Sequence, residues 1–294
     1  TTEIYTLSLH DALPIFPDRD RPLVFAHRGL SSEAPENTIA AFRLASTKGA
    51  PGVELDIHLT ADGKLVVIHD GKTGRVSPGT NLHVEESAYA DLARVDVGAW
   101  KGESFHGEKP PLLAELFEEL GSKLYFDVEI KSDDSADHGL EAALVKLLAD
   151  FRLGADTIMV SSFNPVAVKR FKALQPAIPT AIIYCIDDEL PWYLRHGEGR
   201  WIAGTDVLKP RFSMVHKAGM TLGRMVGGRE VIPWTIDDPA EAGRVLSAGC
   251  SGVISNKPHL LGLPGFSGAD DPGSSVAGMT GGSGQATTGA TTAS

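Results

Sequence analysis

Short β-rich runs alternate with helix-like stretches along most of this 294-residue chain, and this alternation constrains its fold more than any other feature. Strand–helix alternation is typical of a parallel sheet, because a helix carries the chain back to the start of the next strand. About 240 residues with some eight such units favour a closed (β/α)8 TIM barrel of the α/β class over an open doubly wound sheet. The expected strands are Leu23–Ala26, Val53–Leu59, Leu65–His69, Leu124–Ile130, Thr157–Ser161, Thr180–Tyr184, Ile202–Leu208, Val231–Thr235 and Val253–Ser255.

Three features depart from a regular barrel. Nine strands are expected for eight places, so one of them should flank the barrel, and the sequence does not indicate which. The Asp62-Gly63 turn joins the runs Val53–Leu59 and Leu65–His69 with no helix between them. The segment Gly71–Pro111, which follows the third strand, is long for a strand-to-helix connection, and we expect a small insertion over the barrel mouth.

Helical patterns occupy most of the stretches between the runs. Two of them start with a capping side chain directly before a proline, in Asn164-Pro165 and Asp238-Pro239. This order is typical of a helix N-terminus, because the capping oxygen accepts from exposed amides and proline needs no acceptor there. The clearest helices are Thr38–Ser46, Gly139–Phe151, Asn164–Leu174 and Asp238–Gly249.

Both ends of the chain differ from the barrel, which we place at residues 22–264. Residues 1–15 resemble the conceptual translation of a sequencing-library adapter, so we expect an assembly artefact without structure; a natural leader is the alternative. Residues 265–294 are rich in Gly, Ser, Thr and Ala. Such a segment buries too little apolar surface to offset its ordering entropy, and we expect a disordered tail.

Composition narrows the classes of function. A net charge of −11 and a pI near 5.3 argue against a general nucleic-acid binder, which normally carries a basic face. No run is long and apolar enough to span a bilayer, so we expect no stable membrane association. Cys185 and Cys250 lack the spacing of a zinc site or a disulfide framework and are expected to be buried thiols. A cytoplasmic location is the default, with secretion left open because the native N-terminus is expected to be missing.

Five ionisable residues lie within or at the ends of the apolar runs: His27, Glu54, Asp56, His69 and Glu129. Catalytic groups of a TIM barrel come from the C-terminal ends of its strands, and strand alternation places Glu54 and Asp56 on one face. Three converging carboxylates would repel one another, and a divalent cation is the simplest way to stabilise them. Oxygen ligands without thiolates favour Mg²⁺ or Ca²⁺ over zinc.

Each of these residues also has a structural interpretation. A single strand histidine is more often a hydrogen-bonded core residue than a catalyst, but two histidines beside three carboxylates favour acid/base catalysis. Glu54 and Asp56 could form a structural salt-bridge cluster, although few basic residues occur in the neighbouring runs. Catalysis is therefore the leading interpretation.

An ordered set of motifs supports this interpretation. The chain resembles the glycerophosphodiester phosphodiesterase family from Leu23 to Leu263, with the motifs in the family's order. They are HRG (27–29), PENT (35–38), ELD (54–56), VVIHD (66–70), EIK (129–131), SSF (161–163) and WT (234–235). The stretch HDGKTGRV departs from the usual leucine-containing pattern, and PWTIDD departs from the usual VWTVN-like run.

The resemblance implies a role for each matching position. The family's metal ligands fall on Glu54, Asp56 and Glu129, and the metal in relatives is Mg²⁺ or Ca²⁺. Its acid/base histidines fall on His27 and His69. We assign His27 as the general base and His69 as the general acid, an assignment that the sequence alone does not fix.

Further residues are expected to contact the substrate. The family's phosphate-contacting arginine falls on Arg28, and a second cationic contact falls on Lys131. Trp234 and Phe163 could be core aromatics, but at strand ends near the mouth they would form an apolar wall for the alcohol moiety of the substrate.

The expected reaction is metal-dependent hydrolysis of a glycerophosphodiester, such as glycerophosphocholine or glycerophosphoethanolamine, to an alcohol and sn-glycerol 3-phosphate. Water could attack directly, or the glycerol hydroxyl could attack first through a cyclic phosphate. A lysophospholipase D or sphingomyelinase D-like activity is the first alternative, and a non-catalytic binding barrel is the second. The only expected partner is the small-molecule phosphodiester, without nucleic acid or a protein partner.

Overall fold

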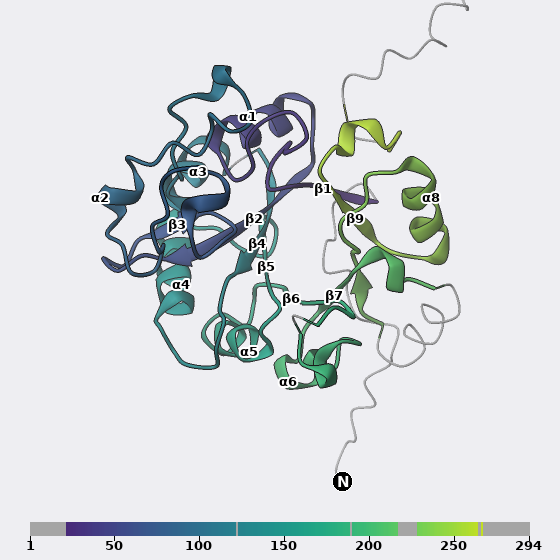
Figure 1. The fold of residues 1–294 in the computed structure, drawn as a ribbon. Helices are drawn as coiled ribbons and strands as arrows, with labels where there is room; N and C mark the ends of the chain where they lie inside the picture. Colours follow the sequence, from purple (N-terminus) through teal and green to yellow (C-terminus); the bar gives the residue numbers. More distant parts are fainter. Residues whose placement is uncertain (1–21, 122, 189, 217–227, 264–265, 267–294) are drawn as a thin grey trace, which may run out of the picture.

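The computed structural model describes residues 22–121, 123–188, 190–216, 228–263 and 266. Within them, parallel strands follow one another around a barrel in the order β8-β7-β6-β5-β4-β2-β1-β9, and the helices lie on its outside (Figure 1). This arrangement confirms the predicted (β/α)8 fold. The strands are β1 Leu23–His27, β2 Gly52–Leu59, β3 Leu65–Val67, β4 Tyr125–Ile130, β5 Ile158–Ser162, β6 Thr180–Tyr184, β7 Val207–Pro210, β8 Glu230–Val231 and β9 Gly252–Ser255.

Backbone hydrogen bonds bring the two end strands of this order together. The amide of Ser251 donates to the carbonyl of Val231 at 2.8 Å, and the amide of Ile254 donates to that of Pro233 at 3.0 Å. The barrel is therefore nearly closed. Because closure leaves few unpaired strand edges, the polar groups at its mouth are held by a continuous framework.

The ninth strand is the flanking one. Strand β3 pairs antiparallel with β2, with Ile57 opposite Val67 and Leu59 opposite Leu65, and the Asp62-Gly63 turn connects them. Gly63 has a φ of +74°, a conformation that favours glycine.

The predicted insertion follows β3 and has an apolar core of its own. Its elements are η1 Thr73–Arg75, α2 Tyr89–Leu92 and η2 Glu103–Phe105. Lys101 Nζ donates to the carbonyl of Ser31 at 2.7 Å, which joins the insertion to the segment after β1. The insertion thus packs beside β3 and reaches the rim of the mouth. Its buried cluster is Val66, Ile68, Val76, Val84, Leu92, Val95 and Val97.

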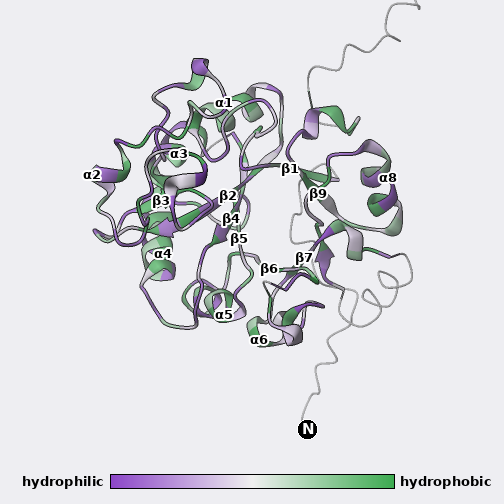
Figure 2. Cartoon of the chain, in the orientation of Figure 1, coloured by the Kyte–Doolittle hydropathy of each residue, from purple (hydrophilic) through white to green (hydrophobic). Residues whose placement is uncertain are grey.

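The remaining α-helices lie outside the barrel and bury apolar residues, and both apolar and polar segments are visible along their ribbons (Figure 2). Asn164 accepts from the amide of Val166 at 2.9 Å, and Asp238 accepts from that of Ala240 at 2.8 Å, so both predicted caps are confirmed. Thr38 caps the first helix by accepting from Ala41. These helices are α1 Ile39–Thr47, α3 Leu113–Leu120, α4 Leu140–Phe151, α5 Pro165–Leu174, α6 Gly199–Ala203 and α8 Pro239–Ala248, with short 3-10 helices η3 Trp192–Leu194, η4 Phe212–Met214 and η5 Pro258–Leu260.

Two predicted strands differ from the observed ones by more than two residues at one end, and the others agree within two residues. The predicted strand Ile202–Leu208 is wrong at its start, because α6 continues to Ala203 and Gly204 ends it at a φ of +63°. A short apolar run does not distinguish a helix from a strand by its period alone. The predicted strand at Val231–Thr235 is shorter in the structure, because Pro233, which faces β9, has no amide hydrogen to donate to that strand.

The predicted terminal segments lie outside the described residues, except Phe266, whose side chain packs against two apolar clusters. Cys185 and Cys250 are both buried, as predicted. Among the residues that the structure describes, no helix has the length and apolar character needed to cross a membrane.

The barrel interior changes from apolar to polar within one strand step. An apolar cluster that includes Phe25, Tyr125 and Met159 fills its lower part. Residues two positions further along the same strands point to the same side and belong to the polar layer above. This layer forms the floor of the site and comprises His27, Glu54, Asp56, Asp127, Glu129, Ser161 and Lys209.

Candidate active site

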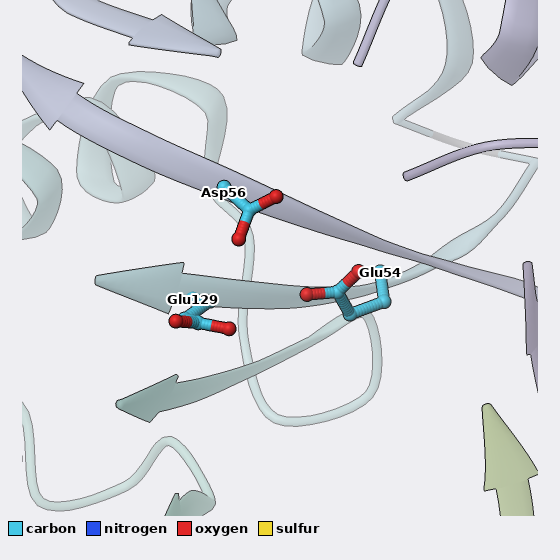
Figure 3. Close-up of side chains that lie close together, drawn as sticks. All are labelled: Glu54, Asp56 and Glu129. Atoms are coloured by element: carbon cyan, nitrogen blue, oxygen red, sulfur yellow. The ribbon is translucent and has the colours of Figure 1, made fainter. Parts of the chain in front are cut away.

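Three carboxylates from two neighbouring strands meet at the mouth of the barrel. Strand β2 supplies Glu54 and Asp56, strand β4 supplies Glu129, and Asp56 lies directly opposite Glu129 in the parallel register. One oxygen from each lies within 4.8 Å of the others, and all three side chains are buried. Figure 3 shows the carboxylates directed toward one another. The predicted convergence of these residues is therefore present.

Asp56 is the most strongly compensated of the three. Lys131 Nζ lies 2.8 Å from Asp56 Oδ1, Arg28 Nε lies 3.3 Å from Oδ2, and Asn37 donates to Oδ2 at 2.8 Å. Burial opposes ionisation of this group, but the charges of Lys131 and Arg28 hold its pKa well below the usual range. Lys131 also donates to Glu129. Asp56 is therefore ionised in the folded protein.

Glu54 has far less charge compensation than Asp56. Burial, followed by the charge of Asp56, raises the pKa of Glu54 well above its usual value. Its Oε2 accepts from the backbone amide of Arg28 at 3.2 Å, and its ion-pair contact among the described residues is His27 Nε2 at 3.8 Å. A buried carboxylate with so little compensation is suited to a cation, and an all-oxygen donor set fits Mg²⁺ or Ca²⁺.

The turn after β1 depends on two residues in the left-handed region. Arg28 has a φ of +56° and Gly29 a φ of +79°. A Cβ on Gly29 would lie 2.7 Å from atoms of Ala41, so no larger residue fits there. Because Arg28 is not glycine, its backbone is strained, and this conformation directs its amide to Glu54. Its guanidinium donates to Glu36 at 2.8 Å.

His27 is held by a neutral partner. Its Nδ1 lies 2.7 Å from Asn256 Oδ1, and the amide of Asn256 is oriented by Asp237, which accepts from Nδ2 at 2.7 Å. Nδ1 therefore carries the proton, and Nε2, which faces Glu54, is left as the basic atom. Burial and then the charge of Arg28 lower the pKa of His27 to about 4, so the ring is neutral at physiological pH.

His69 is held by a charged partner. Its Nδ1 lies 2.6 Å from Asp70 Oδ1, so the carboxylate fixes the orientation of the ring. The backbone carbonyl of His69 accepts from His58 Nε2 at 3.2 Å, and His58 Nδ1 contacts Glu85 of the insertion at 3.0 Å. The imidazole of His69 is near enough to His27 and Asp56 to lower the pKa of both groups.

A buried ion pair lies beside the carboxylates, in the same polar layer, because Asp127 is the register partner of Glu54. Lys209 Nζ lies 2.7 Å from Asp127 and donates to Ser161 Oγ at 2.9 Å, while Ser161 donates to Asp127 at 2.8 Å. Each charged group in this triad has a partner, so the Asp127 charge is balanced by Lys209. The side-chain cations in direct contact with Asp56 and Glu129 are Arg28 and Lys131.

The two predicted wall aromatics are in contact with each other. The rings of Phe163 and Trp234 meet edge to face, with centroids 5.6 Å apart, and both side chains are partly exposed. Trp234 Nε1 donates to the carbonyl of Lys209 at 2.9 Å. Their contact with a substrate stays a prediction.

A model of the glycerophosphoryl diester phosphodiesterase family matches residues 27–260, which is more than half of the chain. The chain belongs to this family. A glycerophosphodiester phosphodiesterase of Caldanaerobacter subterraneus subsp. tengcongensis is 34% identical to it over 243 residues, covering 82% of this chain and 96% of that protein. A glycerophosphodiester phosphodiesterase of Bacillus subtilis is 29% identical over 265 residues, covering 82% of this chain and 86% of that protein.

Solved structures agree with this family membership. A phosphodiesterase of Oleispira antarctica, solved in complex with the product sn-glycerol-3-phosphate, has a TM-score of 0.72 and 29% sequence identity, covering 82% of this chain and 95% of that one. As a member of the glycerophosphoryl diester phosphodiesterase family, the protein is an enzyme of that type, which argues against the alternative of a non-catalytic barrel.

Sequence reasoning for this phosphodiesterase missed several residues that hold the histidines. Asn256 and Asp237 hold His27, whereas Asp70 and Arg75 lie behind His69. Asn256 directly follows β9, and a polar residue at a strand end is a signal that could have identified it. Arg75 lies in the HDGKTGRV stretch and carries no such signal.

Proposed function

We propose that the protein is a metal-dependent hydrolase that cleaves glycerophosphodiesters to an alcohol and sn-glycerol 3-phosphate. The observation that carries the proposal is the buried cluster of Glu54, Asp56 and Glu129 beside two histidines with different partners. In this proposal the three carboxylates hold a divalent ion, Mg²⁺ or Ca²⁺.

Charge balance at the mouth supports a cation there. When all three carboxylates are ionised, as metal ligands are, they carry one negative charge more than the two side-chain cations beside them, Arg28 and Lys131, can balance. A phosphodiester carries one negative charge and would be repelled by that pocket. A divalent ion reverses the sign to one positive charge, which attracts the substrate.

The bound ion would neutralise charge on the non-bridging phosphate oxygens. The chain's own residues supply the rest of the chemistry. The guanidinium of Arg28 contacts two phosphate oxygens with its planar fork, and Lys131 contributes a point charge. Phe163 and Trp234 form the wall against which the alcohol moiety packs.

The two histidines divide the proton transfers. His27 Nε2 accepts the proton of the attacking hydroxyl, whether that of water or of the substrate's glycerol, because its Nδ1 is committed to Asn256. His69, whose ring Asp70 orients through Nδ1, donates a proton to the departing alkoxide.

The test is hydrolysis of glycerophosphocholine, glycerophosphoethanolamine and lysophosphatidylcholine, with EDTA and with Mg²⁺ or Ca²⁺ added back. We expect activity on the two unacylated diesters, loss in EDTA and recovery with metal. Glu129→Gln should lose most activity, whereas Glu118→Gln, an exposed carboxylate on α3, should not. Activity indifferent to chelation would refute the metal, and preference for lysophosphatidylcholine would replace the proposed substrate class by an acylated lipid.

A further inference from the structure

A chain of ion pairs connects His69 with Arg28, and Arg75 of the insertion is its central member. Arg75 Nε donates to Asp70 Oδ2 at 2.5 Å. Its Nη1 and Nη2 donate to the two carboxylate oxygens of Glu36 at 3.0 and 2.7 Å. Two carboxylates from separate segments therefore converge on one guanidinium.

Each of these carboxylates also holds a residue of the proposed catalytic group. Asp70 uses its other oxygen to bind His69 Nδ1 at 2.6 Å. Glu36 accepts from Arg28 Nη1 at 2.8 Å. Arg75 is thus connected to His69, the proposed proton donor, through Asp70. It is connected to Arg28, the proposed phosphate contact, through Glu36.

We propose that Arg75 is a positioning residue that holds His69 and Arg28 in the arrangement the reaction requires. The inference rests on the proposed function of the site. The hydrogen bonds of Arg75 in this series of ion pairs go to Asp70 and Glu36, so Arg75 acts on His69 and Arg28 through these two carboxylates. A lysine could not replace it, because only a guanidinium presents several donors in one fixed plane.

The chemistry of the two carboxylates is consistent with this role. Burial opposes ionisation of Glu36, but hydrogen bonds from Arg75 and the charge of Arg28 lower its pKa. Burial also opposes ionisation of Asp70, and hydrogen bonds from Arg75 and His69 lower its pKa. Both groups are therefore charged at neutral pH, and the chain of ion pairs persists.

Arg75 is itself held by the core of the insertion. It ends η1, in which Thr73 is fully buried and donates through Oγ1 to the carbonyl of Thr80 at 2.9 Å. The amide of Leu82 donates back to Thr73 Oγ1 at 3.1 Å. Val76, directly after Arg75, is buried in the insertion's apolar cluster. The fold of the insertion therefore fixes the point from which Arg75 reaches the site.

A surface residue without a role in positioning would give a different experimental result. The side chain of Arg75 is 46% exposed, and ion pairs so close to solvent add little to the stability of a fold. Replacing Arg75 should therefore leave the protein folded. If Arg75 had no effect on the site, its replacement would leave kcat and KM unchanged.

The experiment compares Arg75→Gln and Arg75→Lys with a control from the same insertion. Arg94→Gln serves as that control, because Arg94 is 81% exposed and pairs only weakly, at 3.6 Å, with Asp91. For glycerophosphocholine with saturating metal, we expect Arg75→Gln to lower kcat/KM by about 10–100-fold, the range found when a residue behind a catalytic ligand is removed. Part of the loss should be a lower kcat, because His69 is no longer held in position. The rest should be a higher KM, because Arg28 is no longer held in position.

The two other variants sharpen the result. Arg75→Lys keeps the charge but reaches one carboxylate at a time, so kcat/KM should stay at least about fivefold below wild type. Arg94→Gln should match wild type within about twofold. An Arg75→Gln variant with wild-type kcat and KM would overturn the inference, as would full recovery in Arg75→Lys.

A second measurement does not depend on activity. Imidazole ¹⁵N resonances should shift for His69 in Arg75→Gln and stay in place for His196, which pairs with Glu198 outside this chain of ion pairs. The His69 signals are assigned by their absence in His69→Ala. If the wild-type enzyme cleaves no glycerophosphodiester, the proposed function fails, and these resonances still decide the inference. Unchanged His69 signals would overturn it.

Discussion

The two histidines at the barrel mouth have different kinds of partner. His27 ends a barrel strand, its side chain is 16% exposed, and its Nδ1 contacts the neutral amide of Asn256. His69 follows the flanking strand β3, its side chain is 31% exposed, and its Nδ1 contacts the carboxylate of Asp70. One histidine therefore belongs to the closed framework of the barrel, and the other belongs to the hairpin and insertion at its rim.

The two histidines therefore have different surroundings, and in the proposed mechanism one residue type serves two roles. The hydrogen bond to Asn256 raises the pKa of His27, but burial and the charge of Arg28 outweigh it and lower that pKa to about 4. The ring of His69 instead has a carboxylate partner at Nδ1. In this mechanism the surroundings of each ring, and not the histidine itself, set which ring accepts a proton and which donates one.

The largest expected effect is the loss of either ring. We expect His27→Ala and His69→Ala each to lower kcat on glycerophosphocholine by about 10²–10⁴-fold, the usual contribution of a general acid or base. Steady-state kinetics with saturating metal measure this, and thermal unfolding checks that the variants fold. His196→Ala, an exposed histidine, is the control. Near-wild-type activity in either site variant would remove that histidine from the reaction.

Removing the neutral partner should have a smaller effect. In Asn256→Ala, His27 loses the acceptor that keeps the proton on Nδ1, so a fraction of the rings adopts the wrong tautomer. We expect kcat to fall by about 10–100-fold, as for other residues that orient a functional histidine. Imidazole ¹⁵N spectra should show the change of tautomer at His27. A loss of activity with an unchanged tautomer would contradict the explanation.

The pH profile tests the charge state of His27. A general base must be neutral, and this ring takes up its proton only as the pH falls toward about 4. We expect kcat/KM to decline about tenfold per pH unit below that value, and not from the ordinary histidine value of 6.5. The same decline of kcat/KM at low pH should persist in His69→Ala. An acid limb centred near 6.5 would mean that His27 is not the base.

The same shift has a consequence for stability. Between pH 6.5 and about 4, the unfolded chain binds a proton on this histidine and the folded chain does not. Acid therefore favours the unfolded state through this window, and the contribution of His27 makes the free energy of unfolding decrease as the pH falls.

The smallest effect is expected at the edge of the His27 network. Ser31 Oγ donates to Asn256 Oδ1 at 3.0 Å, but Asn256 remains oriented by Asp237 without it. Ser31→Ala should therefore change kcat by no more than about twofold. Kinetics measured beside Asn256→Ala provide the comparison. A loss as large as that of Asn256→Ala would show that Ser31, and not Asp237, orients the amide.

The strand-borne part of the site could be predicted from the sequence. Glu54, Asp56 and Glu129 lie in regular strands, where the period of two fixes which side chains share a face. The barrel rule then places them at one mouth. The barrel itself followed from the alternation of strands and helices, although the apolar run at Ile202–Leu208 was assigned to the wrong element.

The partners of the histidines could not be predicted in the same way. Asn256 lies 229 residues from His27 in the chain, and only closure of the barrel between its end strands brings them together. Arg75 reaches Glu36 from an irregular insertion, whose path no periodic pattern specifies. The sequence therefore predicts the strand residues of the candidate site better than the residues that hold its two histidines.

The division of labour between the histidines is tested most directly by changing the leaving group. Glycerophosphocholine releases an alkoxide that needs a proton, whereas the p-nitrophenyl ester of glycerol 3-phosphate releases a phenolate that does not. On the nitrophenyl ester, His69→Ala should recover to within about tenfold of wild type, while His27→Ala should stay about 10²–10⁴-fold impaired. Recovery of His27→Ala instead, or equal losses of His69→Ala on both substrates, would contradict the assignment of His27 as base and His69 as acid.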